Sequence, residues 1–75
     1  LPLADTKETG TYLLTRIHDN FDLLKYLEKH GINIGDKLQV KQFDNFSNTY
    51  TLIHKNEELQ VSLEIAKQLY VERIN

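Results

Sequence analysis

The fold of this chain is decided by the stretch from Phe21 to Asp36, which reads FDLLKYLEKHGINIGD. Its first ten residues have the apolar spacing of a short amphipathic helix, and Gly31 supplies the left-handed conformation that commonly ends a helix. A strand pattern begins directly after Gly35 and Asp36. One early helix among β segments, in a chain of 75 residues, narrows the possible folds sharply. The apolar face of this expected helix comprises Phe21, Leu23, Leu24 and Leu27.

The remaining segments alternate apolar and polar residues in short runs, which is typical of half-buried β-strands. Their spacing predicts strands over residues 11–18, 37–43, 49–54, 58–61 and 69–74. Short strands with one inserted helix enclose too little core as a flat open sheet. We therefore expect a mainly β fold, a small and strongly bent five-stranded barrel.

Two shorter features complete the expected architecture. Ser62 is well placed to cap one or two helical turns over residues 63–68, just before the last strand. The opening residues Leu1 to Asp5 are expected to be extended, because Pro2 directs Leu1 away from helical geometry. The expected core is apolar and comprises Tyr12, Leu14, Ile17, Leu24, Leu27, Ile32, Leu38, Val40, Leu52, Leu59, Val61, Ile65, Ala66 and Val71.

The length and composition are those of one small domain, which buries only about 60% of its unfolded surface. No cysteine is present, which excludes disulfides and thiolate metal ligands and fits a cytosolic origin. The net charge is -2, and no basic patch of the kind that binds nucleic acid is present. No apolar run approaches the ~18 residues of a membrane span. The chain begins at Leu1 and contains no methionine, which indicates a domain excised from a larger protein.

Catalytic chemistry is not predicted for this chain. None of the three histidines stands in a metal-ligand spacing such as His-x-x-x-His, and there is no glycine-rich phosphate loop. Ser47 and Ser62 lack the sequence surroundings of a nucleophile. We therefore expect no enzyme activity, no catalytic residue and no bound organic cofactor.

The polar cluster of most chemical interest is His18-Asp19-Asn20-Phe21-Asp22, between an expected strand and the expected helix. Asp19 and Asp22 are three residues apart, and two carboxylates are suited to bind one hard cation through oxygen. The simpler interpretation is that Asp19 or Asn20 caps the helix and that Asp22 complements the helix dipole. Residue chemistry alone favours the simpler interpretation and leaves the cation site as an alternative.

Several motifs, taken in order, resemble the FeoA domain family. Leu1 to Asp5 resembles its opening "lPL-sdl", and residues 24–35, read as L-x-x-L-x-x-x-G-I-x-I-G, are similar to its central "Ll-x-x-G-l-x-p-G". Residues 61–66, followed by Tyr70 and Val71, resemble its closing "l-s-x-x-l-A-x-x-i-x-V". The resemblance spans nearly the whole chain. The end of the family's first long strand and the strand after its central motif are matched by Arg16-Ile17 and Leu38-Gln39-Val40.

The resemblance implies an SH3-like β-barrel, in agreement with the barrel expected from the strand lengths. FeoA domains occur as free-standing proteins of ferrous iron transport and as C-terminal domains of metal-dependent repressors of the diphtheria-toxin-repressor type. The proline-glycine of the free-standing form is absent near Lys7 and Glu8, and its glycine-proline is absent near residues 46–48. Residues 17–21 look closer to the repressor branch. We therefore expect residues 1–75 to be one FeoA domain, a C-terminal fragment of such a repressor.

In the repressor branch, the resemblance implies that a carboxylate just after the first strand joins metal ligands from the dimerisation domain. Asp19 occupies the matching position and Asp22 a neighbouring one, so both are candidate metal ligands. The implied metal is manganese or iron(II), bound mainly by other domains of the parent repressor. Those domains are the expected partners, in a cytoplasmic homodimer. DNA is bound by the parent protein and not by this domain.

Two other functions stay open on the sequence. One is an accessory protein of ferrous iron transport, whose partner is the cytosolic domain of a membrane iron permease. The other is a general SH3-like interaction module with a peptide-binding groove, which requires exposed aromatic residues gathered in one place. The candidates for such a groove are dispersed along the sequence: Tyr12, Tyr26, Phe46, Tyr50 and Tyr70.

Overall fold

The computed structural model describes residues 1–6 and 8–74. All of the expected strands are present there, and their ends differ from the prediction by no more than one residue. One helix follows the first long strand and a short helix precedes the last strand, which confirms the predicted mainly β fold. The elements in chain order are η1 (Leu3–Asp5), β1 (Gly10–Ile17), α1 (Phe21–Lys29), β2 (Lys37–Asp44), β3 (Thr49–His54), β4 (Glu57–Ser62), α2 (Leu63–Ala66) and β5 (Leu69–Arg73).

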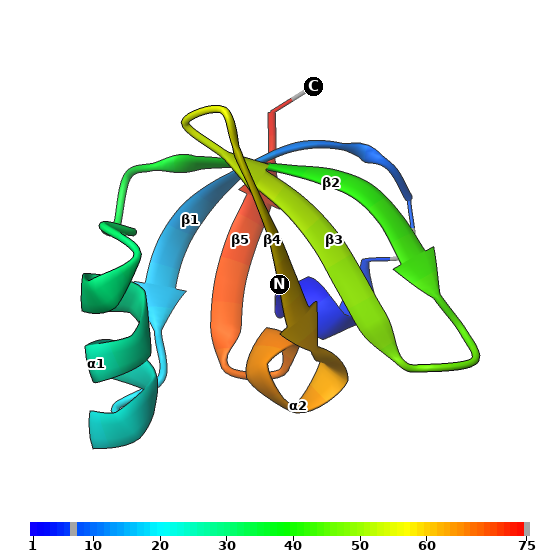
Figure 1. Cartoon of the computed structure of the whole chain (residues 1–75). Helices are drawn as coiled ribbons and strands as arrows, with labels where there is room; N and C mark the ends of the chain where they lie inside the picture. The colour runs from blue at the N-terminus through cyan, green and yellow to red at the C-terminus, as the bar shows by residue number, and fades with distance from the viewer. Residues whose placement is uncertain (7, 75) are drawn as a thin grey trace.

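The strands form one antiparallel sheet in the order β4-β3-β2-β1-β5 (Figure 1). The register shifts between Leu14 and Arg16 in β1 and between Val40 and Gln42 in β2. Such bulges bend a strand and increase its twist, which lets a sheet of short strands wrap around a core. The result is the SH3-like barrel expected above.

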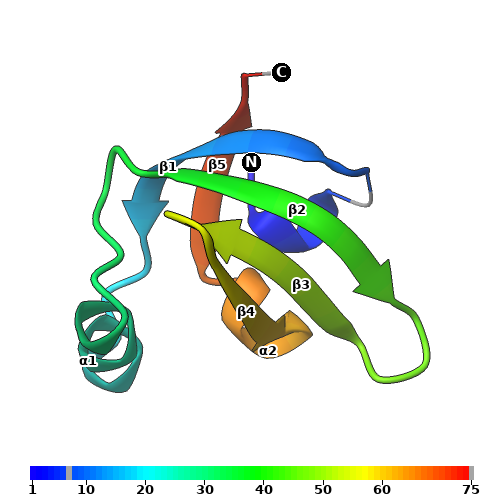
Figure 2. The ribbon, with the colours of Figure 1, turned by 45° about the horizontal axis from the view of Figure 1, so that its top comes forward.

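The seam of the barrel lies between the edge strands β4 and β5, which are not hydrogen-bonded neighbours in the described sheet. It is filled by α2, which packs against β4 and η1, and by η1, which packs against β5 (Figure 2). The Val71 amide donates to the Leu1 carbonyl at 2.8 Å, and Pro2 forms a bridge with Tyr70. The N-terminal residues thereby cover part of the β5 edge, which would otherwise present unpaired backbone groups.

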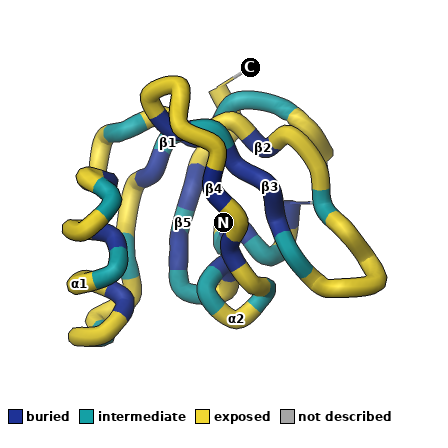
Figure 3. Tube along the Cα trace, in the orientation of Figure 1, coloured by how far each residue is buried: buried dark blue, intermediate teal, exposed yellow. Residues whose placement is uncertain are grey.

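The core lies inside the curved sheet, where buried positions recur along each strand (Figure 3). Ile17 and Ile65, both expected in the core, are only partly buried but pack against it. The sequence prediction did not include four residues that are buried there: Leu3, Leu23, Tyr50 and Leu69.

The assignment of Leu24 to the core is wrong. Leu24 is 43% exposed, whereas Leu23 and Leu27 are 5% and 2% exposed. The helix α1 lies outside the barrel beside β1 (Figure 1), so only a narrow i, i+4 stripe of its surface reaches the core. The other apolar residue of the expected face, Phe21, is 77% exposed. The apolar surface of α1 is therefore wider than the part that the barrel covers.

The expectation that Leu1 to Asp5 is extended is also wrong, because Leu3–Asp5 forms the 3₁₀-helix η1. The Thr6 hydroxyl donates to the Leu3 carbonyl at 2.8 Å and closes this turn. The Tyr50 hydroxyl, which is contributed by β3, donates to the Thr6 carbonyl at 2.6 Å. Burial raises the pKa of the Tyr50 phenol. These tertiary contacts select a turn where the local sequence favours an extended segment.

Gly31 ends α1 as predicted, with φ at +68°. The next residue, Ile32, donates its amide to the Leu27 carbonyl at 2.9 Å and is itself buried. This closure satisfies a carbonyl of the last helical turn. It also turns the chain so that Ile34, two residues on, is 60% exposed.

Candidate functional site

The junction between β1 and α1 is held by Asn20. Its side-chain oxygen accepts from the Leu23 amide at 3.2 Å, so Asn20 is the helix cap and Asp19 is not. The Asn20 amide group donates to the Gln68 side-chain oxygen at 3.0 Å, and the His18 amide donates to the Gln68 carbonyl at 2.8 Å. The segment that carries Asp19 is therefore anchored on both sides to the chain between α2 and β5.

The two candidate metal ligands are placed at this junction with exposed carboxylates. Asp19 precedes the cap, and Asp22 lies in the first turn of α1. Neither carboxylate accepts a hydrogen bond or forms an ion pair in the described part of the chain. Asp22 complements the helix dipole, as the simpler interpretation expected. Asp19 has no structural role of that kind, because Asn20 performs the capping.

The donor set at the junction is incomplete for a metal ion. Within residues 1–6 and 8–74, no group of three or more histidine, cysteine, aspartate or glutamate side chains is arranged to hold a metal. Mn²⁺ and Fe²⁺ accept carboxylate oxygens, so the two residues fit such an ion chemically. One or two carboxylates still leave most of the coordination positions to other ligands.

An apolar surface adjoins the two carboxylates. Phe21 and Leu24 line one shallow groove on α1, and Leu24 also lines a second groove with Ile34. These three residues, which we call the α1 apolar face, are 77%, 43% and 60% exposed, respectively. Large apolar side chains exposed as a group commonly mark an interaction surface. The sequence analysis had placed Phe21 and Leu24 on the apolar face of the helix, had assigned Leu24 to the core, and did not single out Ile34.

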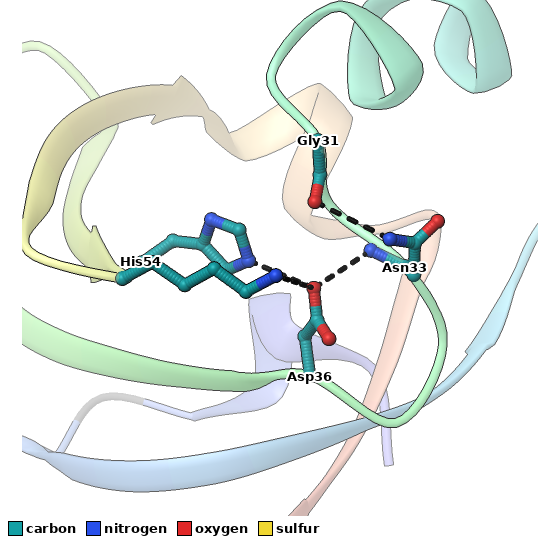
Figure 4. A network of polar contacts seen from close by, with 5 residues as sticks. Gly31, Asn33, Asp36 and His54 are labelled. Carbon is teal, nitrogen blue, oxygen red and sulfur yellow. Dashed lines mark hydrogen bonds and ion pairs between the residues drawn. The ribbon is translucent and has the colours of Figure 1, made fainter.

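A second polar cluster, which was not predicted, joins the α1–β2 connection to the end of β3 (Figure 4). The Nε2 atom of His54 lies 2.8 Å from Asp36 Oδ2, and the same oxygen accepts from the Asn33 amide at 3.0 Å. Lys55 Nζ is 4.0 Å from that oxygen. The backbone hydrogen bond from Asn33 and the hydrogen bond with His54 lower the pKa of Asp36 below its usual 3.8.

The Asp36–His54 pair holds the fold together and is not a second metal site. His54 is 2% exposed, and an ionised carboxylate only accepts, so Nε2 carries the proton of this bond. The pair joins the turn after α1 to the end of β3. The only sequence signal was a histidine at the end of a strand, and 18 residues separate it from its partner.

The aromatic residues do not gather in a peptide-binding groove. Tyr12 and Tyr50 are 2% and 0% exposed, and they belong to the core. Phe43 packs edge-on against Tyr50 with ring centroids 4.6 Å apart. Phe46 is 98% exposed, but it lies alone at the tip of the β2–β3 hairpin. The general peptide-binding hypothesis requires a cluster of exposed aromatic residues, and the positions of these residues do not support it.

The fold and the junction together define a small SH3-like barrel domain with two exposed carboxylates and an exposed apolar surface. The family model described as the FeoA domain matches residues 1–73. The chain therefore belongs to the FeoA domain family, as its motifs indicated. This family is non-enzymatic, in agreement with the prediction that the chain is not an enzyme. No curated protein sequence compared with the chain gives a significant match.

Solved structures similar to the chain include two larger regulators. ScaR with bound Cd²⁺ is 46% identical, with a TM-score of 0.94 over 99% of this chain and 35% of that chain. The manganese regulator SloR is 44% identical, with a TM-score of 0.91 over 97% of this chain and 34% of that chain. The chain thus spans about a third of the length of these regulators.

A small protein shares the fold at low sequence identity. The FeoA-like protein from Clostridium acetobutylicum is 15% identical, with a TM-score of 0.88 over 100% of this chain and 87% of that chain. At this identity the likeness concerns the fold alone. Among the described residues, none of the helices has the length and apolar character needed to cross a membrane.

Proposed function

We propose that this domain is the regulatory C-terminal module of a manganese- or iron-dependent transcriptional repressor. It would pack on the dimerisation and DNA-binding domains of the parent protein and assist its activation by metal. The parent would act as a cytoplasmic homodimer that binds DNA through those other domains. The net charge of -2 on this domain agrees with a role away from the DNA.

The observation that carries this proposal is sequence identity, because shape does not discriminate. The TM-score is 0.94 to ScaR and still 0.88 to the small FeoA-like protein. The identities are 46% and 15%, respectively. ScaR is described as a manganese-activated repressor, and SloR as a manganese regulator. A domain that has kept nearly half of its residues in common with these regulators is best assigned to the same kind of parent.

The residues proposed to contact metal are Asp19 and, next to it, Asp22. A divalent cation supplies positive charge that carboxylates of two different domains can share. The Asn20 cap positions Asp19 by holding the junction to α1 and to Gln68. No competing hydrogen bond or ion pair in the described structure occupies the Asp19 carboxylate. The remaining ligands would come from the rest of the parent protein.

Such a shared site couples metal binding to domain arrangement. When ligands come from two domains, the site is complete only in the arrangement that brings them together. Metal therefore favours that arrangement, and the favoured arrangement raises metal affinity by the same factor. The domain would act by supplying the Asp19 carboxylate in the arrangement that completes the metal site. In the other arrangement this carboxylate would lie away from the metal.

The test is to replace Asp19 with alanine in the full-length parent and to titrate manganese against operator binding. We expect at least about tenfold more manganese for half-maximal binding, because an oxygen that contacts the metal directly is lost while the fold is kept. Asp22→Ala should give a smaller shift. An activation curve that superimposes on that of the wild type would contradict the ligand role.

A matched control separates the ligand effect from a general loss of negative charge. Glu72 carries an exposed carboxylate in β5, and Glu72→Ala removes the same charge without touching the β1–α1 junction. This variant should leave the activation curve unchanged. If Glu72→Ala shifts the curve as far as Asp19→Ala does, the shift reports net charge and not coordination.

The alternative is an accessory protein of ferrous iron transport that binds the cytosolic domain of a membrane permease. The observation in its favour is the shared fold, since the TM-score to the small FeoA-like protein is 0.88 over 100% of this chain. The coding sequence before Leu1 discriminates the two proposals directly. A DNA-binding and dimerisation region encoded there supports the repressor, whereas a start codon there supports the transport accessory protein.

A further inference from the structure

The first residues of the chain cover the free edge of β5 only in part. The Val71 amide donates to the Leu1 carbonyl at 2.8 Å, and Pro2 forms an antiparallel bridge with Tyr70. These two contacts define the direction and the register of an additional strand next to β5. Hydrogen-bonded pairs alternate with unbonded pairs in such a ladder, so Pro2 lies at a position that needs no amide proton from it.

The backbone of Arg73 provides the next hydrogen-bonding groups along this edge. The Ile74 amide donates to the Thr11 carbonyl of β1 at 3.1 Å, whereas the Val71 amide faces Leu1. Because successive amides of a strand point to opposite sides, the amide of Arg73 faces the same side as that of Val71. Apart from the pairing of β5 with β1, Arg73 makes no backbone hydrogen bond in the described part of the chain.

The side chain of Arg73 holds this end of β5 in place. The guanidinium donates to the Thr9 carbonyl and to the Tyr12 hydroxyl, each at 3.3 Å, and lies 3.5 Å from the Glu8 carboxylate. These contacts draw the side chain toward the start of β1 and not over the free edge. A sheet edge with unpaired and well-positioned backbone groups is suited to bind an added strand.

We infer that the free edge of β5 binds the segment of the parent protein that directly precedes Leu1, as a short strand antiparallel to β5. The inference rests on the proposed function, which places residues of the parent before Leu1. In the observed register, the residue directly before Leu1 lies opposite Glu72. The residue before that one lies opposite Arg73 and forms the hydrogen-bonded pair with it. The domain is then connected to its parent without a flexible hinge at Leu1.

Several observations favour this segment over a strand from another molecule. Leu1 already lies on the edge, so residues joined to it have a high effective concentration there. Pro2 restricts Leu1 to extended backbone, so the chain that arrives at Leu1 keeps the direction of a strand. Leu1 is 62% exposed and β4 is not paired with β5, which leaves the path along the edge open in the described structure. This chain spans about a third of ScaR and SloR, so a parent of that size has ample sequence for the segment.

The test is a disulfide between the two strands in the full-length parent. One cysteine replaces the residue directly before Leu1, and the other is introduced as Glu72→Cys. These positions form an unbonded antiparallel pair with Cα atoms about 4.5 Å apart, which suits a disulfide. In a glutathione redox buffer, with the cross-linked peptide measured by mass spectrometry, we expect an equilibrium constant for oxidation at least about tenfold above that of the control pair.

The matched control keeps Glu72→Cys and moves the other cysteine one residue earlier. A shift by one residue directs that side chain to the opposite face of the added strand, so the two sulfur atoms cannot meet. The two variants have the same composition and differ in register alone.

Proline substitutions give a second measurement on the same register. A proline two residues before Leu1 falls at the hydrogen-bonded position and removes a donor from the ladder. It should speed amide hydrogen exchange of Arg73 in the parent about fivefold, the effect of one backbone hydrogen bond. A proline directly before Leu1 falls at an unbonded position, as Pro2 does, and should leave the exchange of Arg73 unchanged.

Each outcome decides the inference. Equal oxidation of the two cysteine pairs would overturn it, as would exchange of the Arg73 amide that responds to neither proline. A disulfide that links two protomers would assign the edge to a second copy and overturn it as well. A start codon directly before Leu1 would overturn the proposed function and this inference together. A parent that manganese activates normally but that forms no selective disulfide would overturn this inference alone.

Discussion

At the scale of single residues, the Asp36–His54 pair is the most consequential contact in the domain. His54 is 2% exposed, whereas the side chain of Asp36 is 19% exposed. A buried imidazole that loses its partner keeps an unsatisfied polar atom, which is more harmful than losing an exposed pair. The pair also fixes the turn that carries Ile34, and Ile34 lines a groove together with Leu24.

We predict that Asp36→Asn lowers the free energy of unfolding by about 1 kcal/mol at neutral pH. The figure is modest because water partly reaches the carboxylate and screens its charge. Urea denaturation of both proteins at one temperature measures the difference. The conservative asparagine preserves an acceptor for the Asn33 amide, so the change isolates the charged contact to His54.

The same pair predicts how this difference varies with pH. The pKa of Asp36 is lowered from 3.8 in the folded state, so the unfolded state takes up the proton first as the pH falls. The stabilisation by Asp36 is therefore complete above about pH 4 and is lost as the pH falls through the folded-state pKa. The difference in the free energy of unfolding between the wild type and Asp36→Asn should therefore become smaller as the pH falls through that range. A gap that is constant from pH 7 down to pH 3 would contradict the ionised pair.

At the scale of secondary-structure elements, the orientation of α1 determines which leucines support the fold and which are free for a partner. Leu23 and Leu27 face the core, and Leu24 faces outward. Adjacent positions on a helix are about 100° apart, so a rotation of the helix by about that angle would exchange the roles of Leu23 and Leu24. The cap at Asn20 and the closure at Gly31 fix the rotation from both ends.

This orientation predicts a large difference between two neighbouring substitutions. Leu23→Ala should lower the free energy of unfolding of the domain by about 2–4 kcal/mol, because it opens a cavity in the core. Leu24→Ala should change it by less than about 0.5 kcal/mol, because that side chain is partly in water. Chemical denaturation of the two variants measures both values. Equal losses would mean that α1 is rotated from the orientation described here.

The helices and strands could be predicted from the sequence because each is marked by residues within or next to its own segment. The strand over 37–44 alternates polar and apolar residues along most of its length, and Asn20 and Ser62 precede their helices as caps. The sequence was insufficient for η1, whose turn depends on the Tyr50 hydroxyl from β3. It was also insufficient for Leu24, since four apolar residues within residues 21–27 of a short helix do not determine which of them face the core.

The candidate site, like the fold, could be predicted from the sequence only in part. Asp19 and Asp22 were identified from type and order, and the structure added that Asn20 is the cap and that Asp19 is left without a structural partner. The contact between Asp36 and His54 joins residues 18 positions apart, and no pattern along the chain marks it. The exposure of Phe21 and Ile34 likewise depends on where the barrel ends, which only the assembled fold defines.

At the scale of the whole molecule, the barrel places the β1–α1 junction, with Asp19 and Asp22, on its surface. Its seam is filled by η1 and α2, so the fold does not need a partner to complete its sheet. Phe21 and the exposed carboxylates of Asp19 and Asp22 are at the start of α1, whereas Ile34 lies beyond its end. A fold this widely shared does not determine the function, as the TM-score of 0.88 at 15% identity illustrates. The proposed function therefore rests on the junction residues Asp19 and Asp22 and not on the fold.

The central claim is that the metal site is shared, with a minor part in this domain and the larger part elsewhere in the parent. Manganese binding followed by electron paramagnetic resonance tests it directly on the isolated domain, the full-length parent and the parent with Asp19→Ala. We predict that the isolated domain leaves manganese in solution at concentrations that saturate the parent, and that Asp19→Ala weakens binding by the parent at least about tenfold. An isolated domain that binds manganese as tightly as the parent, or a parent indifferent to the loss of Asp19, would contradict the account.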